Sequence, residues 1–269
     1  MQSILLHIYD DSGLESRLQA ALDLARAFSG HITCLHATPL EDYLAVDPLV
    51  AAELPEEFSD KMRDLRLALQ KRIEERLEGE GVSWNWVHVD DLISTALIRE
   101  SVLNDIIVLS IASPASPRDE PRPLAAKVST RAPAPVLAVP AALPRLRFER
   151  PAVVAWNGSP EAAAALKSAL PLLRLVPEVH LLEVHENATS YPPDLAARYL
   201  SRHGIEPEIV QHVPIDGDIA ETIRRAASTL DAAFIVMGAY GHSRVREWLL
   251  GGVTRALIQD SSVPLLLAH

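Results

Sequence analysis

The sequence predicts an α/β protein built from two tandem open parallel sheets of five strands each, with helices on both faces. Three observations predict this fold. Short apolar runs alternate with helical stretches rich in Ala and Leu along the 269 residues. The pattern of the first half recurs in the second half. Strands that alternate with helices form parallel sheets, because each crossover helix packs on a face of the sheet.

Each half begins with a buried strand, a turn rich in Asp, Asn, Gly and Ser, and then a helix. We expect these strands at residues 4–10 and 151–157, and these helices at residues 14–28 and 161–173. Ser159 and Pro160 come just before the second of these helices. Serine is a favoured helix cap and proline suits the first helical position, so this helix start is well marked.

The remaining strands also come in matched pairs. We expect second strands at 32–36 and 179–184, third strands at 84–89 and 208–213, fourth strands at 106–110 and 234–238, and fifth strands at 136–139 and 265–268. Acidic loops at 90–91 and 216–218 precede helices, where carboxylates favour the positive end of the helix dipole. A charged helical stretch at 56–78 has only a shorter counterpart at 194–203.

Composition limits the partners and the compartment. The net charge of −11 argues against a nucleic-acid surface and against an anionic membrane surface as partners. The single cysteine, Cys34, lies in an apolar run, which indicates a buried, inert thiol. We see neither a signal-peptide pattern nor an apolar run of membrane-spanning length, so we expect a cytoplasmic protein. The linker is expected at residues 140–150, between domains at 1–143 and 149–269.

A glycine pattern near the C-terminus is the strongest functional signal. The expected strand at 234–238 runs into Gly238 and Gly241, and after nine intervening residues Gly251 and Gly252 open a helix. Glycine lets backbone N–H groups approach an anion, and a helix N-terminus adds unpaired donors and partial positive charge. The pattern predicts a phosphate-binding edge, although glycines after strands can also serve only as turns.

The residues 154–161, Val-Ala-Trp-Asn-Gly-Ser-Pro-Glu, and the spacing Gly238-x2-Gly241-x9-Gly251 carry a family resemblance. With the repeat, they make the sequence resemble the universal stress protein (UspA) family in its tandem two-domain form. The resemblance implies an adenine-nucleotide α-hydrolase-like fold with strand order 3-2-1-4-5 in each domain. Ligands of such sheets bind at the carboxyl ends of strands where the order reverses.

The resemblance also implies a set of binding residues. Adenine would lie near Asn157, its neighbours Trp156 and Gly158, and Val184. The ribose and phosphates would lie against Gly238, Ala239, Gly241, His242, Ser243, Arg244, Gly251, Gly252, Val253 and Thr254. The expected ligand is ATP or another adenine nucleotide, with Mg²⁺ as its companion ion. Asn157 stands where the family has Asp, and Gly252 stands where it has Ser or Thr, which weakens the expected grip on a terminal phosphate.

The first half lacks the pattern. No glycine occurs between Gly81 and Gly158, and prolines follow the expected fourth strand. Proline removes N–H donors, so a phosphate cradle is not expected there. We predict no catalytic residue and no metal ligand, because no P-loop, HExxH, CxxC or GxSxG motif occurs.

These patterns favour a stress-response protein that binds nucleotide in its C-terminal domain, where the ligand would order the loop from Gly238 to Gly252. A non-nucleotide interaction protein with two vestigial crevices is the alternative, and a slow ATP hydrolase is a weaker one. In this family fifth strands pair. We therefore expect the two fifth strands to pair within the chain as a pseudo-dimer, with further homo-oligomers left open.

Overall fold

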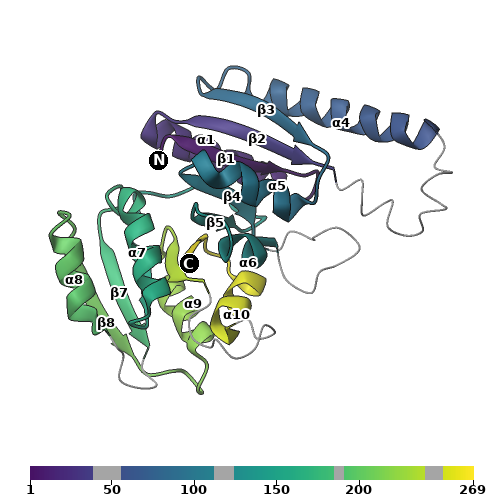
Figure 1. Cartoon of the computed structure of the whole chain (residues 1–269). Helices are drawn as coiled ribbons and strands as arrows, with labels where there is room; N and C mark the ends of the chain where they lie inside the picture. Colours follow the sequence, from purple (N-terminus) through teal and green to yellow (C-terminus); the bar gives the residue numbers. More distant parts are fainter. Residues whose placement is uncertain (39–55, 112–123, 185–190, 240–250) are drawn as a thin grey trace.

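The computed structural model describes residues 1–38, 56–111, 124–184, 191–239 and 251–269 (Figure 1). In the first half the elements are β1 Ser3–Ile8, α1 Leu14–Phe28, β2 His31–Ala37, α4 Glu56–Leu77, β3 Ser83–Val89, α5 Ile93–Glu100, a 3-10 turn Ser101–Leu103, β4 Ile106–Ser110, α6 Leu124–Ser129 and β5 Val136–Val139. In the second half they are β6 Ala152–Trp156, α7 Pro160–Leu173, β7 Val179–Val184, α8 Pro193–Ser201, β8 Pro207–His212, α9 Ile219–Thr229, β9 Ile235–Gly238, α10 Gly252–Asp260 and β10 Leu265–Ala268.

The described strands form one sheet in the order β3-β2-β1-β4-β5-β10-β9-β6-β7-β8. Within each half the order is 3-2-1-4-5 and neighbouring strands are parallel, as predicted. Strands β5 and β10 pair antiparallel and join the two five-stranded halves into one larger sheet. Leu266 pairs with Leu137 at the centre of this contact. Each fifth strand would otherwise expose a row of unpaired backbone groups at a sheet edge.

Two hydrophobic clusters cover the two faces of this sheet. One contains α1, α4, α7 and α8, and the other contains α5, α6, α9 and α10 (Figure 1). Strand β1 shows why both faces are apolar: Ile4 and Leu6 belong to the first cluster and Leu5 to the second, and all three are fully buried. Successive strand residues point to opposite faces, so a strand covered on both sides is apolar throughout.

The helix starts follow local sequence rules. Ser159 caps α7 as predicted, since its hydroxyl oxygen accepts a hydrogen bond from the Ala162 N–H at 3.1 Å. Asp218 caps α9 through the Glu221 N–H at 3.0 Å. Helix α6 was not predicted, because prolines dominate the sequence just before it. No helix among the described residues is both long enough and apolar enough to cross a membrane.

The expected linker at residues 140–150 is anchored to both halves. The Leu146 N–H donates to the Asp23 carboxylate on α1 at 2.8 Å. The Arg147 guanidinium donates to Asp231, after α9, at 3.0 Å. The two halves are therefore held together by this segment as well as by the β5–β10 pair.

Candidate functional site

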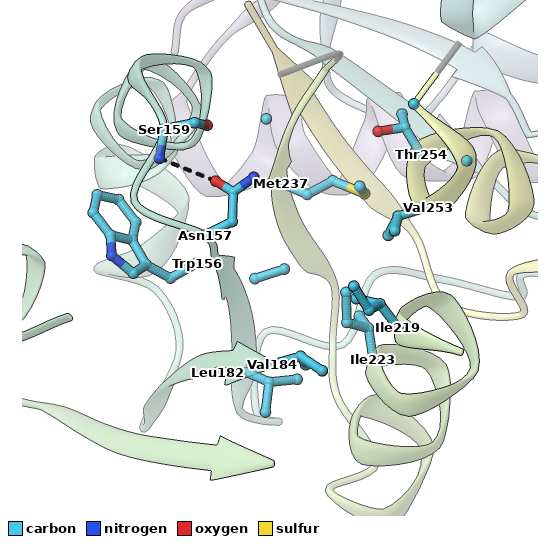
Figure 2. Close-up of a pocket in the computed structure, with 14 residues that line it drawn as sticks. Trp156, Asn157, Ser159, Leu182, Val184, Ile219, Ile223, Met237, Val253 and Thr254 are labelled. Carbon is cyan, nitrogen blue, oxygen red and sulfur yellow. Dashed lines mark hydrogen bonds between the residues drawn. The ribbon is translucent and has the colours of Figure 1, made fainter. Parts of the chain in front are cut away.

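A crevice lies at the carboxyl ends of β6 and β9 in the C-terminal half (Figure 2). Strand β6 is followed in the sheet by β7 on one side and by β9 on the other, so the strand order reverses here. This is the position where open α/β sheets bind ligands. The crevice is lined by Ala155, Trp156, Asn157, Ser159, Leu182, Val184, Ile219, Ile223, Met237, Gly238, Gly251, Gly252, Val253 and Thr254.

One wall of the crevice is apolar. It consists of Leu182 and Val184 from β7, Ile219 and Ile223 from α9, and Met237 from β9 (Figure 2). All five belong to, or pack against, the same hydrophobic cluster. Such a wall suits the flat faces of an aromatic ring system, because burying them removes apolar surface from water.

The first turn of α10 also lines the crevice. Gly251 occupies the N-cap position of α10. Because glycine has no side chain, it makes no capping hydrogen bond to the first N–H groups of the helix. The first helical hydrogen bond runs from the Arg255 N–H to the Gly251 carbonyl at 3.1 Å. The N–H groups of Gly252, Val253 and Thr254 therefore have no acceptor within the helix. They offer donors and partial positive charge to an anion in the crevice.

The turn after β6 sets the polar end of the crevice. Gly158 has φ of 68°, the left-handed conformation that glycine adopts most readily. The side-chain oxygen of Asn157 accepts a hydrogen bond from the Ser159 N–H at 3.1 Å. No charged side chain is among the described residues that line the crevice.

Gly238 has a packing role in addition to its place in the crevice. A Cβ at this position would lie 2.6 Å from the Ala162 nitrogen and 2.7 Å from the Glu161 carbonyl carbon. Both are backbone atoms of α7, so no side-chain rotation relieves the clash. The absence of a side chain lets β9 and α7 approach closely at the floor of the crevice.

The structure brings most of the sequence-predicted residues together. Those that line the crevice are Trp156, Asn157, Val184, Gly238, Gly251, Gly252, Val253 and Thr254. Trp156 contributes little beyond its backbone, because its ring packs with the cluster on the other face and its Nε1–H donates to the Tyr191 carbonyl at 2.9 Å. Four predicted residues lie outside the described ranges: Gly241, His242, Ser243 and Arg244.

Two predicted residues are not among those that line the crevice. Gly158 forms the turn behind it. Ala239 continues the sheet: its N–H donates to the Ala268 carbonyl at 2.8 Å, and its carbonyl accepts from His269 Nδ1 at 2.8 Å. The Ala239 N–H is therefore already used and does not face a phosphate.

Sequence reasoning missed several lining residues, and periodicity could have found them. Ala155 precedes Asn157 by two positions, and Leu182 precedes Val184 by two, so each pair shares a sheet face. Ile219 and Ile223 are four apart and share a helix face. Ser159 and Met237 complete the missed set.

Residues 150–269 match the model of the universal stress protein family. The C-terminal half is a universal stress protein domain. No curated protein matches the chain in a sequence search. The sheet order of this domain, 3-2-1-4-5, recurs in the first half, so the chain carries this fold twice.

Solved structures support the fold of the whole chain. A universal stress protein from Archaeoglobus fulgidus has a TM-score of 0.75 at 18% identity, and the match covers 99% of this chain and 96% of that one. A protein of unknown function from Pseudomonas aeruginosa has a TM-score of 0.61 at 18% identity, covering 100% and 92%. A universal stress protein in complex with cAMP covers 46% of this chain and 99% of its own at 16% identity, with a TM-score of 0.36, which is too low for its ligand to bear on this chain.

In the first half a buried arginine lies between α1 and the carboxyl ends of β1 and β4. Arg17 of α1 is fully buried and donates to the carbonyls of His7, at 3.1 Å, and Tyr9, at 2.8 Å. The same guanidinium pairs with the Asp11 carboxylate at 2.9 Å and donates to the Ser110 hydroxyl. It thereby ties α1 to the carboxyl ends of β1 and β4. Ser110 is the last residue of β4, as Gly238 is of β9.

A buried imidazole lies on the sheet face that forms the crevice in the second half. Leu6 pairs with Val108, two residues before the end of β4. Val154 likewise pairs with Val236, two residues before the end of β9. The residues that follow Leu6 and Val154, His7 and Ala155, are therefore structural counterparts. His7 is 1% exposed, and its ring nitrogens have no hydrogen-bond partner among the described residues. Burial, then the nearby Arg17 and His36, lowers the pKa of His7 well below its ordinary value. It is therefore a neutral space-filling group at neutral pH.

A second cavity lies between α9 and the outer strands β7 and β8. Its lining includes His180, Glu208, His212 and Arg225 around an apolar floor. It contains none of the residues that the sequence singled out as ligand contacts. Within the described residues, no group of three or more His, Cys, Asp or Glu side chains is placed to hold a metal ion.

Proposed function

We propose that this protein is a stress-response or regulatory protein that binds a mononucleotide in its C-terminal crevice, with adenine nucleotides as the ligands expected from the family resemblance. The observation that carries the proposal is the pairing of an apolar wall with three helix-terminal N–H donors at the point of strand-order reversal. The apolar wall suits a base, and the donors of Gly252, Val253 and Thr254 suit a phosphate.

The proposal restricts binding to the C-terminal half, within a domain that we place at residues 149–269. The contrast with the other half supports this restriction. There, Arg17, His7 and Ser110 occupy the positions around the carboxyl ends of β1 and β4. A nucleotide there would meet the buried His7 ring in place of the small Ala155 side chain. We propose that the half at residues 1–143 acts as a scaffold of an internal pseudo-dimer.

Binding rather than turnover is the proposed activity. The described lining offers no carboxylate or imidazole that could act as a general base beside a phosphate. It also offers no carboxylate for Mg²⁺, so an ion that accompanies the nucleotide would be held by the phosphates and water. A protein that binds and does not turn over nucleotide would act by presenting different surfaces with and without it.

Calorimetric titration of the full chain with ATP, ADP and AMP tests the proposal. We expect binding of at least one of the three. The alternative of an interaction protein with two vestigial crevices gains support if none binds at millimolar concentration, and that result overturns our proposal.

Variants at Gly252 locate the site. A side chain there meets no atom of the described residues within 4 Å, and the backbone is not in the left-handed region, so we expect substitution to be tolerated. Gly252→Asp adds a carboxylate at a helix start, which favours the helix but repels a phosphate. We expect at least about 10-fold weaker binding, from a like-charge contact in a partly desolvated crevice. Gly252→Ala is the matched control, and Gly252→Ser supplies a hydroxyl that should strengthen ATP binding.

A further inference from the structure

The side-chain amide of Asn157 has a defined orientation. Its oxygen accepts the hydrogen bond from the Ser159 N–H at 3.1 Å. The Ser159 hydroxyl oxygen in turn accepts from the Ala162 N–H at 3.1 Å, so the turn is joined to the first turn of α7. Rotating the amide by 180° would place an NH₂ group against the Ser159 N–H, two donors facing each other. The network therefore assigns oxygen to the turn and nitrogen to the other side.

The amide nitrogen faces the crevice. Figure 2 shows it turned away from Ser159, on the side where Met237 lies. Because the oxygen is engaged, Asn157 offers a bound ligand a donor and no free acceptor on this side. An aspartate in the same turn would offer a second carboxylate oxygen, which accepts hydrogen bonds only. The substitution therefore reverses the polarity of this contact.

The described lining has two other polar side chains, the hydroxyls of Ser159 and Thr254, and the Ser159 oxygen already accepts from the Ala162 N–H. The side chains that line the apolar wall are Leu182, Val184, Ile219, Ile223 and Met237. The N–H groups that begin α10 are donors. A base that lies against Asn157 therefore meets hydrocarbon on its faces and the Asn157 donor at this edge.

We propose, resting on the proposed nucleotide-binding function, that the crevice prefers 6-oxopurine nucleotides to 6-aminopurine nucleotides. The carbonyl oxygen at position 6 of hypoxanthine or guanine accepts a hydrogen bond from Asn157 Nδ2. The exocyclic amine of adenine is itself a donor and meets that nitrogen unfavourably. Adenine nucleotides still bind through the apolar wall and the phosphate donors, but less tightly. Asn157 is in this view the residue that determines base preference.

Calorimetric titration with inosine monophosphate and AMP tests this preference, because the two ligands differ only at position 6 and at the adjoining ring nitrogen. We expect the wild-type chain to bind inosine monophosphate about 10-fold more tightly, the effect of one hydrogen bond replaced by two opposed donors. Asn157→Asp keeps an acceptor for the Ser159 N–H and presents a second one to the base, so the preference should reverse. Asn157→Ala should bring the two dissociation constants close together.

The outcomes separate this inference from the function beneath it. If the wild-type chain binds both nucleotides equally, or AMP more tightly, the base preference is wrong while nucleotide binding stands. If neither ligand binds at millimolar concentration, the proposed nucleotide binding is wrong, and the proposed base preference is wrong as well. Thermal melting of each variant shows whether it is folded, and the wild-type ratio decides the question even if Asn157→Asp does not fold.

Discussion

Arg17→Ala should destabilise the protein more than any surface charge deletion. Arg17 is fully buried and its guanidinium donates to two backbone carbonyls, a carboxylate and a hydroxyl. Its removal leaves the Asp11 carboxylate, which is 9% exposed, without its cation. Removing one partner of a buried ion pair lowers the free energy of unfolding by about 3–5 kcal/mol. We therefore expect the free energy of unfolding to fall by about this amount.

Urea unfolding followed by circular dichroism measures this loss. Arg63→Ala is the control, because its ion pair with Asp60 is more than half exposed on both sides and should contribute less than about 1 kcal/mol. Combining Arg17→Met with Asp11→Asn removes both charges of the pair and should recover part of the loss. A loss below 1 kcal/mol for Arg17→Ala would refute the view that this cation fixes the carboxyl ends of β1 and β4.

Three further predictions concern the same framework. Gly238→Ala should lower the free energy of unfolding by about 1–3 kcal/mol, because its methyl group would meet the α7 backbone at 2.6 Å; Gly251→Ala, with its nearest atom at 4.0 Å, should be nearly neutral in the same urea titration. Burial, then the charge of His88 and Arg66, lowers the pKa of His36 to about 4, with Asp90 opposing. The unfolded chain then binds more protons, so stability should be greatest above about pH 6.5 and fall by up to about 3 kcal/mol towards pH 4, and His36→Gln should flatten this dependence in urea titrations across that range. Burial raises the pKa of Cys34 to about 12, so an aromatic disulfide reagent at pH 8 should modify the native thiol far more slowly than the unfolded one; equal rates would contradict its burial.

Much of the fold was predictable because its determinants are local and repeated. The helix at Leu14–Phe28 has the predicted bounds, and Ser159 followed by Pro160 marks the start of α7. Parallel strands buried on both faces leave continuous apolar runs, so Ile106–Ser110 and Val179–Val184 also have the predicted bounds. The joining of two sheets into one depends on an antiparallel pair across more than a hundred residues, which was expected from the family and not from local pattern.

The site was only partly predictable, because its chemistry depends on which hydrogen bonds are already made. Ala239 follows a glycine in the motif, yet its N–H is used by the sheet. Asn157 was expected near the base, but which of its two polar atoms faces the ligand depends on its hydrogen bond with the Ser159 N–H. Asp11 pairs with Arg17, six residues further on, and nothing in the local sequence marks this ion pair. Each of these features is a hydrogen bond or ion pair in the folded chain, and such a contact cannot be recognised from the amino-acid sequence alone.

The two halves meet one steric requirement in opposite ways. In each half the end of the fourth strand lies against the start of the first helix, and one of the two must lack a side chain. In the second half the strand supplies the glycine, Gly238, opposite α7 with its cap Ser159. In the first half the helix cap supplies it: a Cβ on Gly13 would lie 2.5 Å from the Ser110 hydroxyl of the strand. The strand of the first half can therefore carry a serine, and that serine contacts Arg17. The position of one glycine decides whether the strand end stays bare, as beside the crevice, or holds an internal cation.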